Sequence, residues 1–228
     1  MMKDDSRISM KVDIWSDIRC PFCYIGKRKF EIALDQFPHK DKVAVAWHSF
    51  QLDPGLKTQP EINVLDYLAK IKGITRAEAA QMHEHVKQVA DEIGLKFDFD
   101  RSVLANSFNG HRLIQLAKAK GMANETEEAL FKAHFTDGKN IDDNETLRNI
   151  GVEVGIPESE LQELFTKGTF ADKVREDEVQ ARSIGIRGVP FFIFNNKYAI
   201  SGAQAPEFFL QTLGKAWDEL QKTQDIMV

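Results

Sequence analysis

Two cysteines separated by two residues carry the thiol chemistry of this chain. Cys20 and Cys23 are the sole cysteines among its 228 residues, and the motif reads Cys-Pro-Phe-Cys. Two intervening residues at the start of a helix leave the first thiol exposed and its partner close enough to form a disulfide. The amino terminus of a helix stabilises a thiolate at its first turn, and Pro21 suits the first helical position because it lacks an N–H. The spacing therefore predicts a redox-active pair.

Two other uses of such a pair are less favoured by the rest of the sequence. A structural zinc ion needs two further ligands, from a second cysteine pair or from closely spaced histidines. The histidines are scattered, and His83 and His85 would lie on different faces of a helix. We therefore predict no metal site. Two inert, buried cysteines are the other alternative, because free cysteine often behaves as a small hydrophobic residue.

Composition excludes several classes of function. The chain has 43% hydrophobic and 29% charged residues, as in an ordinary globular protein, and its sixteen phenylalanines indicate a phenylalanine-rich core. A net charge of −5 argues against general nucleic-acid binding, which needs basic surface. No run approaches the roughly 20 apolar residues of a membrane span, and no apolar secretory segment follows Met1. We expect no membrane association and a cytoplasmic location, where a lone vicinal pair is more often catalytic than structural.

The residues around the motif form a β-α-β unit. An alternating apolar pattern predicts a strand over Met10–Ser16, directly before the cysteines. Apolar residues at helical spacing predict a helix over Pro21–Phe37, which a proline ends. A second strand is predicted over Val43–Phe50, and we expect His48 near its end to be structural. A crossover helix of this kind implies that the two strands are parallel.

The middle of the chain, residues 59–169, reads as a block of helices. Start and stop signals recur along it, with a capping box at Thr75–Glu78 and helix starts at Asn124, Asn144 and Pro157. A block of this length has the size of a domain. We therefore predict an all-helical insertion between two halves of one α/β domain, residues 10–58 and 170–222.

The second half of that domain contains a helix, a hairpin and a last helix. The patterns predict a helix over Phe170–Gly185, strands over Val189–Phe194 and Tyr198–Ser201, and a helix from Pro206 through Leu220. We expect the tail from Gln221 to be frayed. The predicted fold class is thus α/β, in the order β-α-β, helical insertion, α-β-β-α.

This order and three motifs resemble one known family. A β-α-β unit carrying Cys-x-x-Cys, then a helical insertion and an α-β-β-α unit opening on Val-Pro, resembles a thioredoxin fold of the DsbA type. Asn106–Ile114 resembles the N-x-x-x-A-H-R-L motif of the FrnE-like branch of DsbA oxidoreductases, with Gly110 as a minor departure from alanine. Gly188–Phe194 and Ile200–Gln204 resemble the G-V-P-x-F and S-G-A-Q segments of that branch. The branch is related to 2-hydroxychromene-2-carboxylate isomerases and kappa-class glutathione transferases, which carry serine at the position of Cys20.

The resemblance implies roles for the cysteines and their neighbours. Cys20 would be the attacking thiolate, and Cys23 would resolve the mixed disulfide. Pro21 and Phe22, between the cysteines, would tune the redox potential. Phe22 stands where the periplasmic oxidase of the family has a histidine that is implicated in stabilising the thiolate, so we expect a less oxidising disulfide. Pro190 resembles the cis-proline that packs beside the motif, and the alternative is a trans proline at a strand edge.

The resemblance also implies a substrate cleft beside the cysteines. Val189 would offer its backbone to a bound peptide or thiol, and Gly188 would leave room for this approach. Asn106 and His111 of the helical insertion would line the same cleft. The alternative for His111 is a surface or capping histidine.

The function implied by the resemblance is thiol–disulfide exchange, in which disulfides are reduced, formed or isomerised through a mixed disulfide. The partners would be disulfide-containing proteins or small molecules, and no cofactor would be required beyond glutathione or a thioredoxin-type reductant as co-substrate. The alternative is a glutathione-dependent isomerase or transferase, in which the start of the last helix, near Gly202–Ala205, would hold the tripeptide's carboxylate. The intact cysteine pair favours the oxidoreductase. The sequence leaves open the direction of exchange and the formation of a homodimer.

Overall fold

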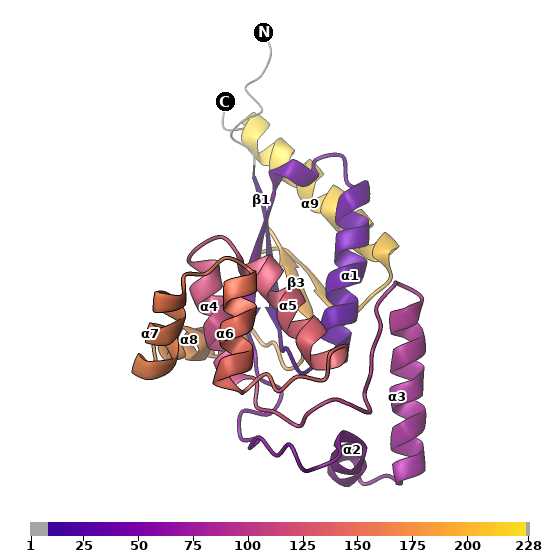
Figure 1. The fold of residues 1–228 in the computed structure, drawn as a ribbon. Helices are drawn as coiled ribbons and strands as arrows, with labels where there is room; N and C mark the ends of the chain where they lie inside the picture. The colour runs from indigo at the N-terminus through magenta and orange to yellow at the C-terminus, as the bar shows by residue number, and fades with distance from the viewer. Residues whose placement is uncertain (1–8, 227–228) are drawn as a thin grey trace.

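A mixed four-stranded sheet forms the centre of the fold, which a computed structural model describes for residues 9–226. β1 and β2 are parallel, as their crossover helix predicts, and β3 is antiparallel to both of its neighbours, β1 and β4. In Figure 1 the sheet lies between helices on either side, which confirms the α/β class. The strands stand in the order β2-β1-β3-β4, with bounds β1 Met10–Ser16, β2 Val43–Ser49, β3 Phe191–Phe194 and β4 Tyr198–Ser201.

Phenylalanines pack one face of the sheet against α1 (Pro21–Gln36) and α9 (Pro206–Ile226). The rings of Phe30 in α1 and Phe192 in β3 have centroids 5.7 Å apart, and Phe209 of α9 meets Phe192 at 4.7 Å. All three side chains are buried. Tilted and edge contacts of this kind add to the hydrophobic stabilisation. The phenylalanine-rich core that the composition indicates therefore lies on this face.

The opposite face is covered by α8 (Ala171–Ser183), which also packs on β2. Trp15 of β1 forms a small separate cluster there with Ala181 and Ile186. The central strand β1 is thus buried on both faces, which explains why its residues do not alternate strictly between apolar and polar.

The predicted helical insertion is confirmed as a run of helices. A capping box is present at the start of α3, where Thr75 and Glu78 bond reciprocally, and Asp143 caps α6. Apolar residues of these helices and of the sheet belong to one continuous core. The domain boundaries near residues 58 and 169 stay predictions. The helices are α2 Val64–Lys72, α3 Arg76–Asp91, α4 Phe108–Lys118, α5 Ala123–Phe135, α6 Asn144–Glu153 and α7 Glu158–Lys167, and a short 3₁₀ turn, η2, spans Lys40–Lys42.

Element boundaries differ from expectation at several places. β3 begins at Phe191, because residues 188–190 form a bend and leave the ladder with β1. Pro157 precedes α7 as its capping residue and is not its first helical residue. The tail after Gln221 continues α9 as far as Ile226, where fraying was expected, and the last two residues lie outside the described part. Neither α9 nor any other helix within residues 9–226 is long and apolar enough to cross a membrane.

His48 is structural, and it links β1, β2 and α8. Its Nε2 lies 2.6 Å from Asp13 Oδ1, and its Nδ1 lies 3.0 Å from Asp177 Oδ1. Its ring stacks on Trp15 with centroids 4.4 Å apart. Because both ring nitrogens face carboxylate oxygens, these contacts favour the imidazolium, the form that donates from both nitrogens. Burial alone would lower the pKa of His48, but the two carboxylates raise it above its ordinary value.

We expect this histidine to make folding stability depend on pH. A group whose pKa is raised on folding stabilises the protein fully below its unfolded pKa, and this contribution is lost as the pH rises through the folded pKa. The free energy of unfolding should therefore fall as the pH rises above about 6.5, the unfolded value. The replacement His48→Gln should lower stability more at about pH 6 than at about pH 9. Urea unfolding across this range measures both effects, and a loss that is the same at every pH would contradict the assignment.

Candidate redox site at the amino terminus of α1

Cys20 is the residue immediately before α1. Its N–H donates to the Asp17 carbonyl at 2.9 Å, and its own carbonyl accepts the N–H of Cys23 at 2.9 Å. Pro21 fills the first helical position, as the motif predicts. The unpaired N–H groups of the first turn and the helix dipole favour negative charge at this end of the helix. The sequence therefore places its first sulfur at the positive end of the helix dipole.

Both cysteines are free thiols, and both are buried. Cys20 is 5% exposed and Cys23 is 1% exposed, so the expectation of an exposed first thiol is wrong. The cause is the bend at residues 188–190, because the Val189 carbonyl lies against the sulfur of Cys20. Cys20 remains accessible as part of the wall of a cavity.

Pro190 and its neighbours lie directly beside the cysteine motif. The Val189–Pro190 peptide bond is cis, as the resemblance implies. The Val189 carbonyl accepts a hydrogen bond from the Cys20 thiol, with sulfur and oxygen 3.7 Å apart. The Pro190 ring packs on α1 at Gly26, where an added Cβ would come within 2.9 Å of the ring Cγ. A Cβ added at Gly188 would meet nothing within 4 Å, so the space beside this residue is open.

A cavity of about 570 Å³ opens beside Cys20, bounded by the start of α1 on one side and by α2 and α3 on the other. In Figure 1, α2 and α3 stand apart from α4, α6 and α7. Phe22, Ile71 and Met82 line the cavity and are each at least 40% exposed. Exposed apolar surface around a cavity is typical of a binding site. Further lining residues are Val64, Leu68, Val86, Phe99, Val103 and Leu104, with Arg19, Asp53 and Lys72 as charged members.

A buried group of charged residues lies behind the cysteines. The backbone N–H of Asp17 donates to Cys23 Sγ at 3.5 Å, and the Asp17 carboxylate accepts the N–H of Leu52 at 2.8 Å. His111 Nε2 lies 3.5 Å from Asp17 Oδ1, and both residues are fully buried. His111 was expected to line the cleft, or else to be a surface or capping histidine. It does neither, because α4 turns this side chain into the core behind Cys23.

These buried groups shift the pKa values of one another. Burial raises the pKa of the Cys23 thiol well above its usual value. Burial alone would raise the pKa of Asp17 and lower that of His111, but their mutual attraction reverses both directions. Burial raises the pKa of Glu127, on α5, to about 7. Within residues 9–226, no group of three or more His, Cys, Asp or Glu side chains is arranged to hold a metal ion.

Asn106 connects loops, and it is not among the residues that line the cavity. Its side-chain carbonyl accepts the N–H of Phe108 at 2.7 Å and the amide of Gln51 at 3.0 Å, and its own amide donates to the Leu56 carbonyl at 2.7 Å. The expected contact of Asn106 with substrate stays a prediction. Its side chain bonds to two backbone groups and to the Gln51 side chain, and these contacts hold the start of α4 beside the loop after β2.

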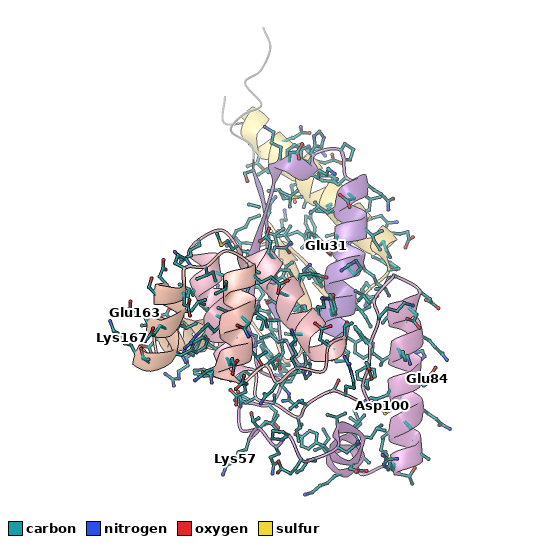
Figure 2. The ribbon with its side chains drawn as sticks, in the orientation of Figure 1. Glu31, Lys57, Glu84, Asp100, Glu163 and Lys167 are labelled. Atoms are coloured by element: carbon teal, nitrogen blue, oxygen red, sulfur yellow. The ribbon has the colours of Figure 1, made fainter. Side chains whose placement is uncertain are left out.

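An ion-pair network between α1 and α5 was missed from the sequence. Lys27, one turn after Cys23, has a side chain that is 2% exposed, and its Nζ lies 2.6 Å from carboxylate oxygens of both Glu31 and Glu128. Figure 2 labels Glu31 on α1. The Tyr24 hydroxyl donates to Glu128 at 2.6 Å. A buried ammonium needs such partners, and a lysine at helical spacing between buried residues of α1 is the signal that could have revealed it.

Gly110, which stands where the related motif has alanine, allows a close contact between α4 and a neighbouring loop. The sequence did not predict this contact. An added Cβ would lie 2.6 Å from Cδ1 of Ile18, a fully buried residue two positions before Cys20. The glycine thus lets α4 approach the loop that leads into the cysteines. The alanine of the related motif would require Ile18 to move.

Known proteins are similar to this chain in sequence or in fold. A family model described as DSBA-like thioredoxin domain matches residues 11–214. A probable DsbA oxidoreductase from Streptomyces coelicolor is 38% identical, with a TM-score of 0.86 over 92% of this chain and 91% of that one. Two structures below 25% identity share the fold. A 2-hydroxychromene-2-carboxylate isomerase is 14% identical, with a TM-score of 0.66 over 96% of this chain and 99% of that one. The cytosolic disulfide reductase DsbM from Pseudomonas aeruginosa is 16% identical, with a TM-score of 0.63 over 91% of this chain and 98% of that one.

Proposed function

The chain belongs to the DSBA-like thioredoxin domain family, and we propose that it is a thiol–disulfide oxidoreductase with Cys20 and Cys23 as its redox pair. One observation carries this proposal. Cys20 stands at the start of α1 in the wall of a cavity, with the Val189 carbonyl beside its sulfur and Cys23 one turn behind. This arrangement provides an attacking sulfur, a resolving sulfur and a backbone edge for a substrate.

Exchange proceeds in two displacements. The Cys20 thiolate attacks one sulfur of a substrate disulfide, a new S–S bond forms, and the electron pair of the broken bond leaves on the other substrate sulfur, which takes a proton from solvent. Deprotonated Cys23 then attacks Cys20 Sγ, and the second substrate sulfur leaves in the same way. The substrate gains two electrons and the protein loses two, and the reverse sequence forms a disulfide.

The cavity favours substrates that carry apolar groups beside the disulfide, since its lining from α2 and α3 is mainly apolar. Disulfide-containing proteins and small apolar disulfides both fit this description. The motif at Asn106–Ile114 supports the FrnE-like branch, and Phe22 between the cysteines supports reduction or isomerisation in the cytoplasm. DsbM, which shares the fold, is a cytosolic disulfide reductase and has also been solved with glutathione. Glutathione or a thioredoxin-type protein is the corresponding electron donor.

A glutathione-dependent isomerase is the second candidate function. The likeness of fold to 2-hydroxychromene-2-carboxylate isomerase raises it. The Lys29 ammonium donates to the Ala203 carbonyl at 3.3 Å, which puts a positive charge beside residues 202–205 before α9. A carboxylate of glutathione would be favoured there. In this case disulfide formation between Cys20 and Cys23 would be incidental.

Equilibration of the purified protein with glutathione redox buffers distinguishes the two functions. We expect thiol trapping to show a reversible two-electron transition between the Cys20–Cys23 dithiol and its disulfide at a defined potential, which also sets the direction of exchange. Absence of a disulfide at every buffer ratio would reject the oxidoreductase. A Cys20→Ser protein that retains full activity on a glutathione conjugate would favour the isomerase.

A further inference from the structure

We propose that the cavity beside Cys20 is a binding site for small apolar acids, with Arg19 as the residue that holds the acidic group. The substrates are then low-molecular-weight disulfides that join an apolar group to a carboxylate or a similar anion. This inference rests on the proposed oxidoreductase function and names its substrate class. Arg19 directly precedes Cys20 in the chain, and both residues line the cavity. An anion held by Arg19 is therefore beside the attacking sulfur.

Exposed apolar side chains gather around this cavity. Four of the eight large apolar side chains that are exposed within residues 9–226 line it: Phe22, Leu52, Ile71 and Met82. Single exposed apolar residues are normal on a protein surface, but a group of them around a concave site is typical of ligand binding. The volume of about 570 Å³ is that of a site for a small molecule. The ligand that covers these side chains therefore has an apolar body.

Arg19 is a half-buried cation of the cavity wall whose charge is not neutralised by the protein. The nearby Asp17 carboxylate accepts the backbone N–H of Arg19, at 3.2 Å, and not its side chain. A guanidinium has a planar set of donors that matches a carboxylate, and such charge-assisted hydrogen bonds are among the strongest in proteins. Among the described residues, the arginines that form ion pairs are Arg28, Arg76, Arg101 and Arg175, and Arg19 is not one of them.

The other charged residues of the wall do not oppose an acidic ligand. Asp53 brings a carboxylate, but its two oxygens already accept the Tyr67 hydroxyl at 3.1 Å and the N–H of Gly55 at 3.2 Å. Lys72 is exposed at the end of α2 and brings a second cation. Two cations against one carboxylate leave the described wall with one positive charge in excess. This charge favours an anionic ligand over a neutral or cationic one.

Two histidines of the wall are neutral and have unused hydrogen-bonding capacity. His134 of α5 is 6% exposed, and burial, together with the positive charge of Arg19, lowers its pKa to about 4. Burial also lowers the pKa of His83 on α3. The Nδ1 atom of each ring is buried and has no hydrogen-bond partner among residues 9–226. Buried polar atoms almost always have a partner, and the oxygen atoms of a bound acid are suitable acceptors for an imidazole N–H.

Arg19 acts on the choice of substrate and not on the chemistry itself. The Cys20 thiolate attacks one sulfur of the acidic disulfide, a new S–S bond forms, and the other half leaves as a thiolate with the electron pair of the broken bond. Cys23 then displaces the half that is bound to Cys20, as for any other disulfide. The ion pair with Arg19 strengthens binding only when the substrate carries an anion. Its removal should therefore discriminate between acidic and neutral disulfides.

Two aromatic disulfides that differ in charge test this discrimination. 5,5′-Dithiobis(2-nitrobenzoate) carries a carboxylate on each ring, 4,4′-dithiodipyridine is uncharged near pH 7, and each releases a coloured product, thiopyridone from the second, when Cys20 attacks. Arg19→Met keeps the length of the side chain and removes its charge. This variant should slow the first release from the acidic disulfide about 10-fold more than that from the neutral one.

Arg187→Met is the matched control for Arg19→Met. Arg187 is exposed beside the bend at residues 188–190, and it is not among the residues that line the cavity. Its replacement removes the same charge from the same part of the surface, so the ratio of the two rates should stay that of the wild type. An equal change of the ratio in both variants would show that general attraction of anions, and not Arg19, accounts for the preference.

An acid without sulfur tests the site without any exchange chemistry. Calorimetry should show saturable binding of 4-phenylbutyrate, and its uncharged analogue 4-phenylbutanol should bind about 10-fold more weakly. Ile71→Glu adds a carboxylate to the cavity wall at an exposed position, and Ile71→Gln adds a neutral side chain of the same size. The acid should bind more weakly to Ile71→Glu than to Ile71→Gln, because the added carboxylate repels it. Equal binding to both variants would place the acid outside this cavity.

Several results would overturn the inference. One is an equal loss of rate on both disulfides in Arg19→Met, which would assign the charge of Arg19 to the Cys20 thiolate and not to the substrate. Another is a wild-type protein that does not bind 4-phenylbutyrate, or that binds it no better than the alcohol. A wild-type protein that binds the acid but releases nothing from either disulfide would confirm the acid site and reject the proposed oxidoreductase function, so the two failures are distinct.

Discussion

Replacement of Cys20 with serine is expected to reduce disulfide exchange to the uncatalysed rate. A serine hydroxyl cannot form a disulfide, so the first displacement has no nucleophile. Cys23 cannot take over, because it is 1% exposed and burial raises the pKa of its thiol well above the usual value. The assay is the release of thiopyridone from 4,4′-dithiodipyridine together with the reduction of insulin, measured on the purified variant. Both signals should be lost while the fold, monitored by thermal unfolding, is retained.

Cys23→Ser is the matched control for this variant. It should keep the first displacement, because Cys20 is still present in the cavity wall, and it should then stop at the mixed disulfide. One equivalent of thiopyridone should be released, and mass spectrometry should show a stable adduct on Cys20. If Cys20→Ser still released thiopyridone at the wild-type rate, or if Cys23→Ser released two equivalents, the assigned roles of the two sulfurs would be wrong.

The scaffold of this site could be predicted from the sequence because its signals are local. The strand Met10–Ser16 is found with the predicted bounds, and the capping box at Thr75–Glu78 closes as the residue types require. A capping box needs residues only three positions apart, and a helix or strand period is visible within one segment. Such signals do not depend on how distant parts of the chain pack, so they can be recognised from the sequence alone.

The surroundings of the cysteines could not be predicted in the same way, because distant segments assemble them. The burial of Cys20 depends on the bend at residues 188–190. The motif around His111 indicates importance, but it does not say which neighbour the ring meets, and the answer is Asp17 from the loop after β1. Glu127 looks like any helical glutamate in the sequence, but in the folded chain it is 1% exposed. In each case the surroundings of the residue depend on burial by distant segments of the chain, which the sequence pattern does not reveal.

Gly26→Val is expected to destabilise the protein and to slow exchange at the same time. An added Cβ would lie 2.9 Å from Pro190 Cγ and 3.4 Å from Cζ of Phe192, and valine adds two further methyl groups. The proline ring cannot turn aside like the end of a long side chain, so α1 must move away from it. Overpacking of this kind lowers the free energy of unfolding by about 1–3 kcal/mol. The movement also changes the position of Cys20 relative to the Val189 carbonyl, now 3.7 Å from its sulfur.

Gly214→Ala provides the control, because a Cβ at this position of α9 meets nothing within 4 Å. Its effect is that of helix propensity alone, a gain of about 0.5–1 kcal/mol in stability, with exchange unchanged. Urea unfolding and the rate of the first thiopyridone release measure both variants. A Gly26→Val protein with wild-type stability would show that α1 and Pro190 separate without penalty. We expect stability and rate to fall together, because both effects arise from one movement of α1. A destabilised variant with the wild-type rate would show that the contact stabilises the fold but does not set the position of Cys20.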